Sequence, residues 1–115
     1  MNNVEKGRIG ENIALKFLID KGATILERNY WSKFGEIDII AYFDATEIVF
    51  IEVKSRTNCK YGYPAEAVDI NKQNKIRKTA EYYIMSNFIE DVSVRFDVIE
   101  IYIKDRKIKH IINAF

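Results

Sequence analysis

Two apolar runs interrupted by carboxylates constrain this chain more than any other feature. They lie in the segment GEIDIIAYFDATEIVFIEVKS, residues 35–55. Short runs of isoleucine, valine and phenylalanine on either side of a polar break are typical of two adjacent β-strands. Charged side chains are rarely buried without a partner, yet Asp38 interrupts the first run and Glu52 the second, with Lys54 two residues later. The segment therefore predicts a hairpin that carries polar chemistry within a sheet.

The polar break at 44–46 predicts the register of this hairpin. A turn centred on Ala45 sets Asp38 opposite Glu52, and residues paired in this way have Cβ atoms about 4.5–5.5 Å apart. Lys54 shares the face of Glu52, because residues two apart in a strand point to the same side. Opposed carboxylates destabilise a sheet unless a cation lies between them, so the pairing favours a magnesium-type site with oxygen ligands. The alternative is that all three side chains face solvent and form surface ion pairs.

Composition agrees with a globular protein. The chain has 115 residues, 48% of them hydrophobic and 30% charged, which fits a single domain over 1–115 with its own core. One cysteine cannot form an internal disulfide, and one histidine with one cysteine argues against a zinc site. No apolar stretch approaches the roughly 20 residues that span a bilayer. We expect a soluble cytoplasmic protein that does not interact with membranes.

Hydrophobic periodicity predicts an α/β fold with the order α-β-β-β-α-β-β. The expected helices are 4–21 and 72–87, and the expected strands are 24–30, 36–42, 47–55, 94–103 and 107–113. Asn71 is the expected N-cap of the second helix, whose core stripe would be Ile76, Ala80, Tyr83 and Ile84. The run 48–51 is apolar at every position and so predicts a central strand. This order favours a mixed sheet with a helix on either face.

Charge is unevenly distributed although the net charge is only +1. Between Lys54 and Lys78 there are seven basic and two acidic residues, whereas between Glu36 and Glu52 there are five acidic residues and no basic one. A basic region beside an acidic pocket suits a metal-using enzyme that acts on a polyanion. Charges scattered over solvated faces are the alternative.

The sequence resembles the YraN-like family along nearly its whole length. Asp38 followed by Glu52-Val53-Lys54 is similar to the D…(D/E)-x-K signature of restriction-endonuclease-like nucleases. The segments that carry the family resemblance are Gly10-Glu11, Arg28–Trp31, Gly35–Ala41, Val49–Arg56, Glu66–Val68, Lys72-Gln73, Arg95–Val98 and His110–Phe115. The family is uncharacterised and is regarded as a predicted endonuclease related to archaeal Holliday-junction resolvases.

The resemblance implies a restriction-endonuclease-like αβββαβ core and a site within it. Asp38 and Glu52 would be metal ligands for Mg²⁺ (or Mn²⁺), together with the backbone carbonyl of Val53. Lys54 would be the catalytic lysine, which orients the attacking water, favours its hydroxide form, or neutralises charge on a phosphoryl oxygen. Glu11 matches a glutamate on the first helix of resolvase-like relatives that completes the metal site. Its alternative is an exposed glutamate near a helix N-terminus.

Further residues are candidates for supporting roles. Glu36 is either an outer carboxylate of the site or the polar start of its strand. Lys72 and Gln73 lie at the N-terminus of the second helix, where they would bind phosphate or the attacking water. Contacts to nucleic-acid phosphates are expected from Arg56, Lys60, Lys72 and Lys75.

The remaining unusual side chains have mostly structural interpretations. Trp31 borders a polar turn, where it either packs on the sheet edge, which we favour, or stacks on a base. His110 is interpreted as a structural residue of the last strand, and Cys59 is assigned no role.

These features together predict a metal-dependent nuclease that hydrolyses phosphodiester bonds, with DNA at branched or structured sites as the expected substrate. Since a four-way junction has two-fold symmetry, the resemblance to resolvases also implies a homodimer. The rival hypothesis is a nucleic-acid-binding or protein-interaction module that keeps the nuclease fold but does no chemistry.

Overall fold

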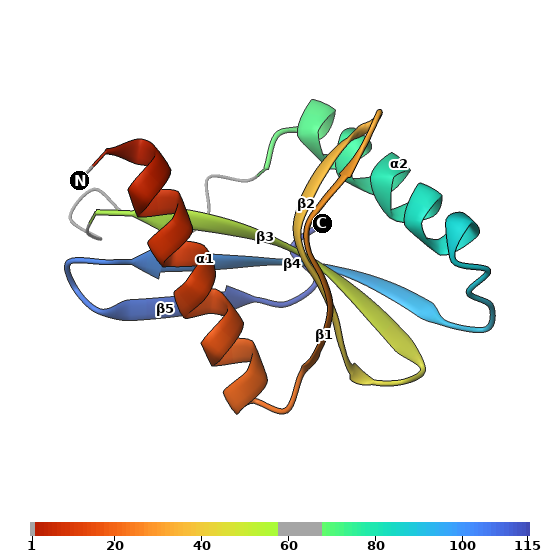
Figure 1. Ribbon diagram of the computed structural model, residues 1–115, viewed down its shortest axis with the longest axis horizontal. Helices are drawn as coiled ribbons and strands as arrows, with labels where there is room; N and C mark the ends of the chain where they lie inside the picture. The colour runs from red at the N-terminus through yellow and green to blue at the C-terminus, as the bar shows by residue number, and fades with distance from the viewer. Residues whose placement is uncertain (1, 58–67) are drawn as a thin grey trace.

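A computed structural model describes residues 2–57 and 68–115 of the chain (Figure 1). The elements are α1 (Asn3–Asp20), β1 (Thr24–Ser32), β2 (Gly35–Asp44), β3 (Glu47–Arg56), α2 (Ile70–Ser86), β4 (Ser93–Tyr102) and β5 (Lys107–Ile111). The predicted order of helices and strands is confirmed. Their ends differ from the predicted ends by two residues at most.

The strands form one mixed sheet in the order β1-β2-β3-β4-β5. β3 and β4 are parallel, and every other neighbouring pair is antiparallel. α2 forms the crossover between β3 and β4, because parallel strands cannot be joined by a tight turn. The prediction that residues 48–51 belong to a central strand is confirmed, since β3 lies in the middle of the sheet and buries all four of them.

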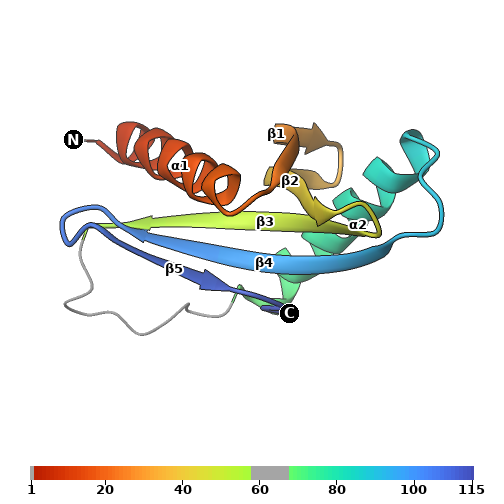
Figure 2. The ribbon, with the colours of Figure 1, turned by 90° about the horizontal axis from the view of Figure 1, so that it is seen from below.

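The two helices pack against opposite faces of the sheet, as predicted. Val49 and Ile51 of β3 join a cluster with Ala14 and Leu18 of α1, whereas Phe50 joins the cluster of α2. Three of the four residues of the predicted α2 stripe are buried, and Ile84 is partly buried. Figure 2 shows α1 along one side of the layer formed by β3, β4 and β5. The alternation of side chains along β3 thus divides the core into two halves.

The β1–β2 hairpin twists sharply away from the rest of the sheet. Figure 1 shows it running steeply across β3, β4 and β5. Asn29 in β1 has a φ of 49°, which interrupts the extended backbone. The two neighbours of Asn29 pair with Ile39 and Ile37 of β2. Ile39 belongs to the α1 cluster, whereas Ile37 belongs to the α2 cluster. Residues two apart share a face in a regular strand, so the hairpin turns over at Asp38.

The N-cap predicted for α2 was wrong. Asp69, rather than Asn71, caps the helix, and its side chain accepts a hydrogen bond of 2.9 Å from the backbone N–H of Lys72. A cap carboxylate also interacts favourably with the positive end of the helix dipole. Asn71 is the second residue of the helix and is exposed. The cap matters for the site because it fixes the first turn of α2, which carries Lys72.

A buried polar network attaches the C-terminal strand to β4. Asp97 is fully buried and accepts two hydrogen bonds of 2.9 Å from Arg95. It also lies 2.7 Å from His110 Nε2 and accepts a bond of 3.1 Å from the backbone N–H of Asn113. This bonding confirms the structural role predicted for His110. The described helices include none that is both long and apolar enough to cross a membrane.

Candidate acidic site at the fork of β2 and β3

The site forms where β2 and β3 separate. The predicted register is confirmed, because Ile39 pairs with Ile51 and Ala41 with Val49, so the next positions along the strands are Asp38 and Glu52. Beyond Ile39 and Ile51 the described ladder ends. The backbone N–H of Val53 donates a hydrogen bond of 2.8 Å to Asp38 Oδ2 in its place. The carboxylate thus replaces a ladder partner and holds the fork open.

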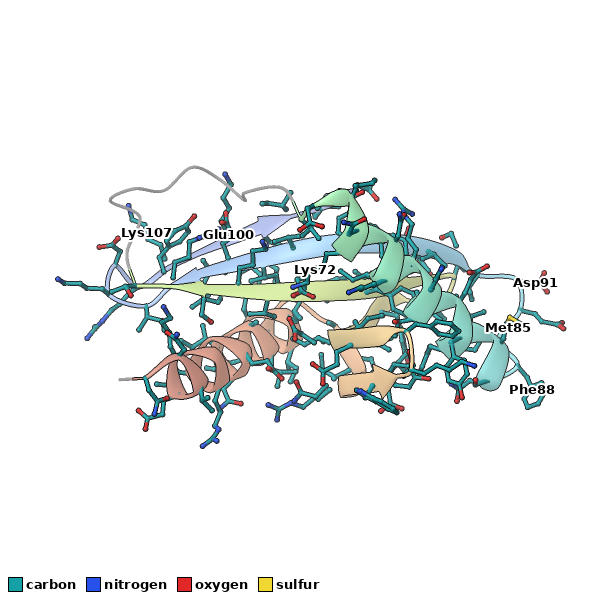
Figure 3. The ribbon with its side chains drawn as sticks, turned by 90° about the horizontal axis from the view of Figure 1, so that it is seen from above. Lys72, Met85, Phe88, Asp91, Glu100 and Lys107 are labelled. Atoms are coloured by element: carbon teal, nitrogen blue, oxygen red, sulfur yellow. The ribbon has the colours of Figure 1, made fainter. Side chains whose placement is uncertain are left out.

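Glu52 and Lys72 form an ion pair within this fork. Lys72 Nζ lies 2.8 Å from Glu52 Oε1, and the Glu52 side chain is only 10% exposed. Figure 3 shows Lys72 between α2 and β3. The two residues belong to a cavity of about 220 Å³ whose lining is Gly35, Glu36, Asp38, Glu52, Lys72, Lys75 and Ile76. Asp38, Glu52 and Glu36, predicted from the sequence as candidates, therefore meet in one cavity with two lysines of α2.

Burial and like charge act strongly on Asp38. Burial and the neighbouring Glu52 raise the pKa of the Asp38 carboxyl to about 7, with a smaller contribution from Glu11, against the lowering effect of the Val53 hydrogen bond and the Lys72 charge. Functional sites often contain a carboxyl group whose pKa is raised by burial and by a neighbouring carboxylate. A cation bound between the two groups would offset the repulsion from Glu52, although burial is the larger cause of the shift.

Lys72 supplies part of that compensating charge. Burial disfavours its ammonium form, but the hydrogen bond to Glu52 and the charges of Glu52 and Asp38 outweigh burial and raise the pKa of Lys72. Lys72 therefore stays charged and acts as an internal counter-ion to the acidic pair. The sequence predicted that this lysine contacts phosphate, whereas in the structure its ammonium group forms an ion pair with Glu52.

Glu11 lies near the acidic pair on the opposite helix. Its charge contributes to the raised pKa of Asp38, and Arg28 Nη2 lies 4.0 Å from its Oε1. That oxygen is buried without a hydrogen-bond partner among the described residues, which is costly for a polar atom. Glu11 does not belong to the lining of the cavity. Its unsatisfied oxygen favours the predicted ligand role over the alternative of a fully exposed helix residue.

Val53 and Lys54 continue β3 past the fork. The N–H and C=O groups of a strand residue point to the same side, so the carbonyl of Val53 points toward β2, as its N–H does. Lys54 lies beside Glu100 in the register of β3 and β4 and is likewise absent from the cavity lining. The Val53 carbonyl is therefore on the β2 side of the strand, and Lys54 lies next to a further carboxylate, Glu100.

The other basic candidates have different surroundings. Arg56 Nε lies 3.2 Å from Glu100 Oε2, so its guanidinium binds a carboxylate of β4. Gln73 donates a hydrogen bond of 2.7 Å to the carbonyl of Val68, which ties α2 to the segment before it. Lys75 lines the cavity. Lys60 and Cys59 lie outside the described residues.

Sequence reasoning missed Glu100 and the contact between Lys72 and Glu52. Glu100 is fully buried and interrupts the apolar run VIEIY of β4, which is the same signal that identified Glu52. The Lys72 contact had no such signal, because β3 and α2 are joined by a long connection and no period within either element relates Glu52 to Lys72.

Oxygen donors of this kind suit a hard divalent cation. Asp38, Glu52 and the carbonyl of Val53 all offer oxygen atoms, and Glu11 Oε1 is buried without a hydrogen-bond partner among the described residues. Within residues 2–57 and 68–115, no three His, Cys, Asp or Glu side chains form a ready-made metal cluster. Magnesium is commonly held by only one or two carboxylates, with water and substrate phosphates completing its coordination. The residues therefore fit Mg²⁺ or Mn²⁺ in an open site.

The fold and the site define a mixed α/β protein with an acidic cavity at the fork of its central hairpin, compatible with the αβββαβ core of restriction-endonuclease-like proteins. The chain belongs to the uncharacterised protein family UPF0102, whose family model matches residues 10–101. The resemblance to the YraN-like family is thereby confirmed.

Individual relatives extend this match to the full chain. A UPF0102 protein of Clostridioides difficile (strain 630) is 54% identical over 115 residues, all of both chains. One of Thermodesulfovibrio yellowstonii is 50% identical over 115 residues, covering 100% of this chain and 99% of the relative. Among solved structures, Pyrococcus furiosus SfsA in complex with Ca²⁺ is 14% identical with a TM-score of 0.35. It matches 95% of this chain, which spans 62% of that protein, and is too distant to inform function.

Proposed function

We propose that this protein is a metal-dependent nuclease that hydrolyses phosphodiester bonds in DNA, with branched or otherwise structured DNA as its substrate. The observation that carries the proposal is the pair of carboxylates, Asp38 and Glu52, held together in a cavity where their mutual repulsion favours binding of a cation. Purely structural carboxylates would be expected to find partners that lower their pKa, as Asp97 does.

Each site residue has a role in this proposal. Asp38, Glu52 and the Val53 carbonyl would hold Mg²⁺ or Mn²⁺, and Glu11 would complete the site. The ion would supply Lewis-acid activation of the phosphodiester and a lowered pKa for an attacking water. Hydrolysis forms a bond from the water oxygen to phosphorus and breaks a bond from phosphorus to a sugar oxygen, which leaves with a proton. Lys54 would stabilise negative charge on the phosphoryl oxygens as that bond breaks.

Lys72 would change partner during this cycle. Its ammonium group lies 2.8 Å from Glu52 Oε1, where a divalent ion would repel it. On release it would remain at the first turn of α2, close enough to bind a phosphate of the substrate. Lys75, on the same helix and the same cavity, would act with it, and Arg56, Gln73 and Lys60 remain candidates for further backbone contacts. A homodimer would suit a symmetric four-way junction.

One observation favours a rival. The ion pair between Lys72 and Glu52 neutralises the acidic pair without a metal, as it would in a module that binds nucleic acid and does no chemistry. Metal binding decides between the two, because the rival needs no cation between Asp38 and Glu52.

Calorimetric titration with Mn²⁺ tests the site itself. We expect wild type to bind the ion and the double variant Asp38→Ala/Glu52→Ala to lose this binding. Glu81→Gln on the exposed face of α2 is the matched control and should bind as wild type does. Equal binding by wild type and the double variant would rule out the proposed metal site.

A cleavage panel tests the reaction. Linear duplex, single-stranded, flapped and four-way DNA, together with RNA, are incubated with Mg²⁺, with Mn²⁺ or with EDTA. We expect metal-dependent cleavage that Lys54→Ala reduces by about 100-fold or more while substrate binding is largely retained. Metal binding without cleavage of any substrate would support the rival module, and cleavage in EDTA would refute the proposed chemistry.

A further inference from the structure

Trp31 is exposed at a position where a strand residue could have been buried. Its side chain belongs to β1, yet it is 69% exposed, so the sheet-edge packing favoured from the sequence was wrong. Its two neighbours face α2: the ring centroid of Tyr30 lies 5.0 Å from that of Tyr83, and Ser32 Oγ lies 3.4 Å from Thr79 Oγ1. Since strand residues alternate in direction, Trp31 points away from α2.

Trp31 lies next to the turn that joins β1 and β2, and Gly35 and Glu36 on the other side of that turn line the acidic cavity. Trp31 pairs directly with Glu36, and Glu36 lines the cavity together with Asp38 and Glu52. Side chains of directly paired residues lie on the same face, with Cβ atoms about 4.5–5.5 Å apart. The indole and the Glu36 side chain therefore lie on the face of the hairpin turned away from α2, whereas Lys72, Lys75 and Ile76 line the cavity from the α2 side.

Three lysines lie near the hairpin turn that separates the indole from the cavity. Lys33 follows Trp31 in the hairpin turn, with its Nζ 5.3 Å from the ring centroid of Phe34. Lys75 lines the cavity itself. Lys78 lines a second cleft with Phe34 and Tyr82 on the other side of the turn. Glu36 pairs with Trp31, and Glu81 shares the cleft of Lys78, so a phosphate is expected over Lys33 and Lys75 and a neutral base over Trp31.

An exposed indole with lysines at the adjacent turn is an arrangement that can bind single-stranded nucleic acid. Bases stack on aromatic side chains while cationic groups follow the backbone, and the stacking is largely independent of sequence. Duplex bases are already stacked on each other and present no free face. The arrangement therefore discriminates by strandedness.

From this arrangement we infer that Trp31 stacks on an unpaired base of a nucleic-acid strand whose backbone passes Lys33 at the hairpin turn and continues to Lys75 and the acidic cavity on the α2 side. The substrate class is then nucleic acid with a single-stranded segment next to the bond at the cavity, such as a flap, a gap or an open junction. This inference rests on the proposed function for what happens in the cavity, but the stacking contact itself requires no catalysis.

Intrinsic fluorescence tests the contact directly, because Trp31 is the one tryptophan of the chain. The full-length protein is titrated in EDTA, which prevents cleavage, with an oligothymidylate about ten nucleotides long. We expect saturable quenching of the indole emission, and a fully paired duplex of similar length should quench far less. Quenching should weaken as salt rises, since the lysines bind phosphate.

Binding of a fluorescein-labelled copy of the same strand, followed by anisotropy, tests the variants. Trp31→Ala should weaken binding by about tenfold, the effect of losing one stacked base, and Trp31→Phe should lose less. Phe88→Ala is the matched control: Phe88 is also an aromatic residue, 90% exposed, but it lies at the far end of α2 from Lys72 (Figure 3). Its removal should leave binding unchanged.

Three results would overturn the inference: no binding of the single strand, binding that leaves the indole emission unchanged, or equal quenching by single strand and duplex. A fourth result would show that Trp31 contacts a second copy of the chain. In that case the indole emission would shift with protein concentration in the absence of nucleic acid, and Trp31→Ala would dissociate a dimer. Failure of the proposed function is separate. Quenching without metal-dependent cleavage would refute the proposed nuclease activity and support the stacking contact. Cleavage without quenching would support the nuclease activity and refute the stacking contact.

Discussion

Lys72 Nζ lies 2.8 Å from Glu52 Oε1, so an ammonium group from a helix occupies the position beside the acidic pair that a cation would take. The pair joins the first turn of α2 to the fork of β2 and β3. It stabilises this junction and, under the proposed function, would compete with an ion bound by Asp38 and Glu52. Structural stability and metal affinity would then be opposed at this site.

Removal of the ammonium group should separate these two effects. Lys72→Ala leaves Glu52 nearly buried without its partner, so we expect the metal-free protein to lose about 1–3 kcal/mol of stability. Its affinity for Mn²⁺ should rise by about fivefold to tenfold, because the ion no longer displaces a bound cation. Urea unfolding in EDTA and calorimetric titration measure the two quantities.

Lys75→Ala is the control for this experiment. Lys75 lines the same cavity, so its removal lowers the local positive potential by the same formal charge. If the two variants gain affinity equally, then general electrostatics, and not the contact with Glu52, explains the effect.

Asp38→Asn should stabilise the metal-free protein at high pH. The folded state keeps the Asp38 proton up to about pH 7, whereas the ordinary pKa of 3.8 applies to the unfolded chain. The contribution of this carboxyl to stability is therefore fully present below pH 3.8 and is lost as pH rises through about 7. Asparagine does not titrate, so the variant should gain about 1–3 kcal/mol over wild type above pH 7 and little near pH 4.

Urea unfolding in EDTA across this pH range measures the difference between Asp38→Asn and wild type. Addition of Mn²⁺ should reverse it at pH 8, since only wild type keeps both carboxylates. A difference in stability that does not change with pH would show that Asp38 titrates normally.

Asp97→Asn should have the opposite effect on stability. Burial alone would raise the pKa of Asp97, but hydrogen bonds from His110, Arg95 and the Asn113 backbone outweigh burial and lower it. The stability from this carboxylate is present above the ordinary pKa of 3.8 and is lost as pH falls through the lower folded value. We expect Asp97→Asn to cost about 2–4 kcal/mol near pH 7 and progressively less below pH 4.

Thermal or urea unfolding at several pH values checks this prediction. Asp91→Asn is the control, because Asp91 is exposed and has a positive φ that asparagine also adopts. A cost for Asp97→Asn no larger than that of the control would mean that the network contributes nothing to stability.

Gly10→Ala should disturb the contact between α1 and β3. A Cβ at Gly10 would overlap Ser55 Oγ and lie 2.9 Å from Ser55 Cβ, so the helix would have to move away from the strand. We expect a loss of about 1–3 kcal/mol. Gly7→Ala on the same helix meets nothing within 4 Å and should instead gain about 0.5–1 kcal/mol.

The double variant Gly10→Ala/Ser55→Gly tests the cause, since it removes the atoms that clash. Its stability should recover part of the loss. If the double variant is no more stable than the sum of the two single changes, then close packing of α1 on Ser55 is not the reason for this glycine.

Local patterns in the sequence were sufficient for the elements and for the hairpin register. Val49 and Ile51 alternate with Phe50 because a strand has a period of two. The predicted register holds from Ile39 to Ala41, although Asp44 pairs with Glu47 and a register shift separates the turn from that segment. The same pattern pointed to Asp38 and Glu52. The cap of α2 was less predictable, because Asp69 and Asn71 are both good caps and only the path of the preceding chain selects one.

The sequence by itself thus determined which carboxylates meet, since hairpin pairing is a local property of adjacent strands. Tertiary structure alone decided what surrounds them. Lys72 reaches Glu52 only because the crossover helix returns over the sheet, Arg56 turns to Glu100 because β4 lies beside β3, and Trp31 stays exposed because its neighbours face α2. Contacts between elements depend on how the whole chain packs, and no period within one element encodes them.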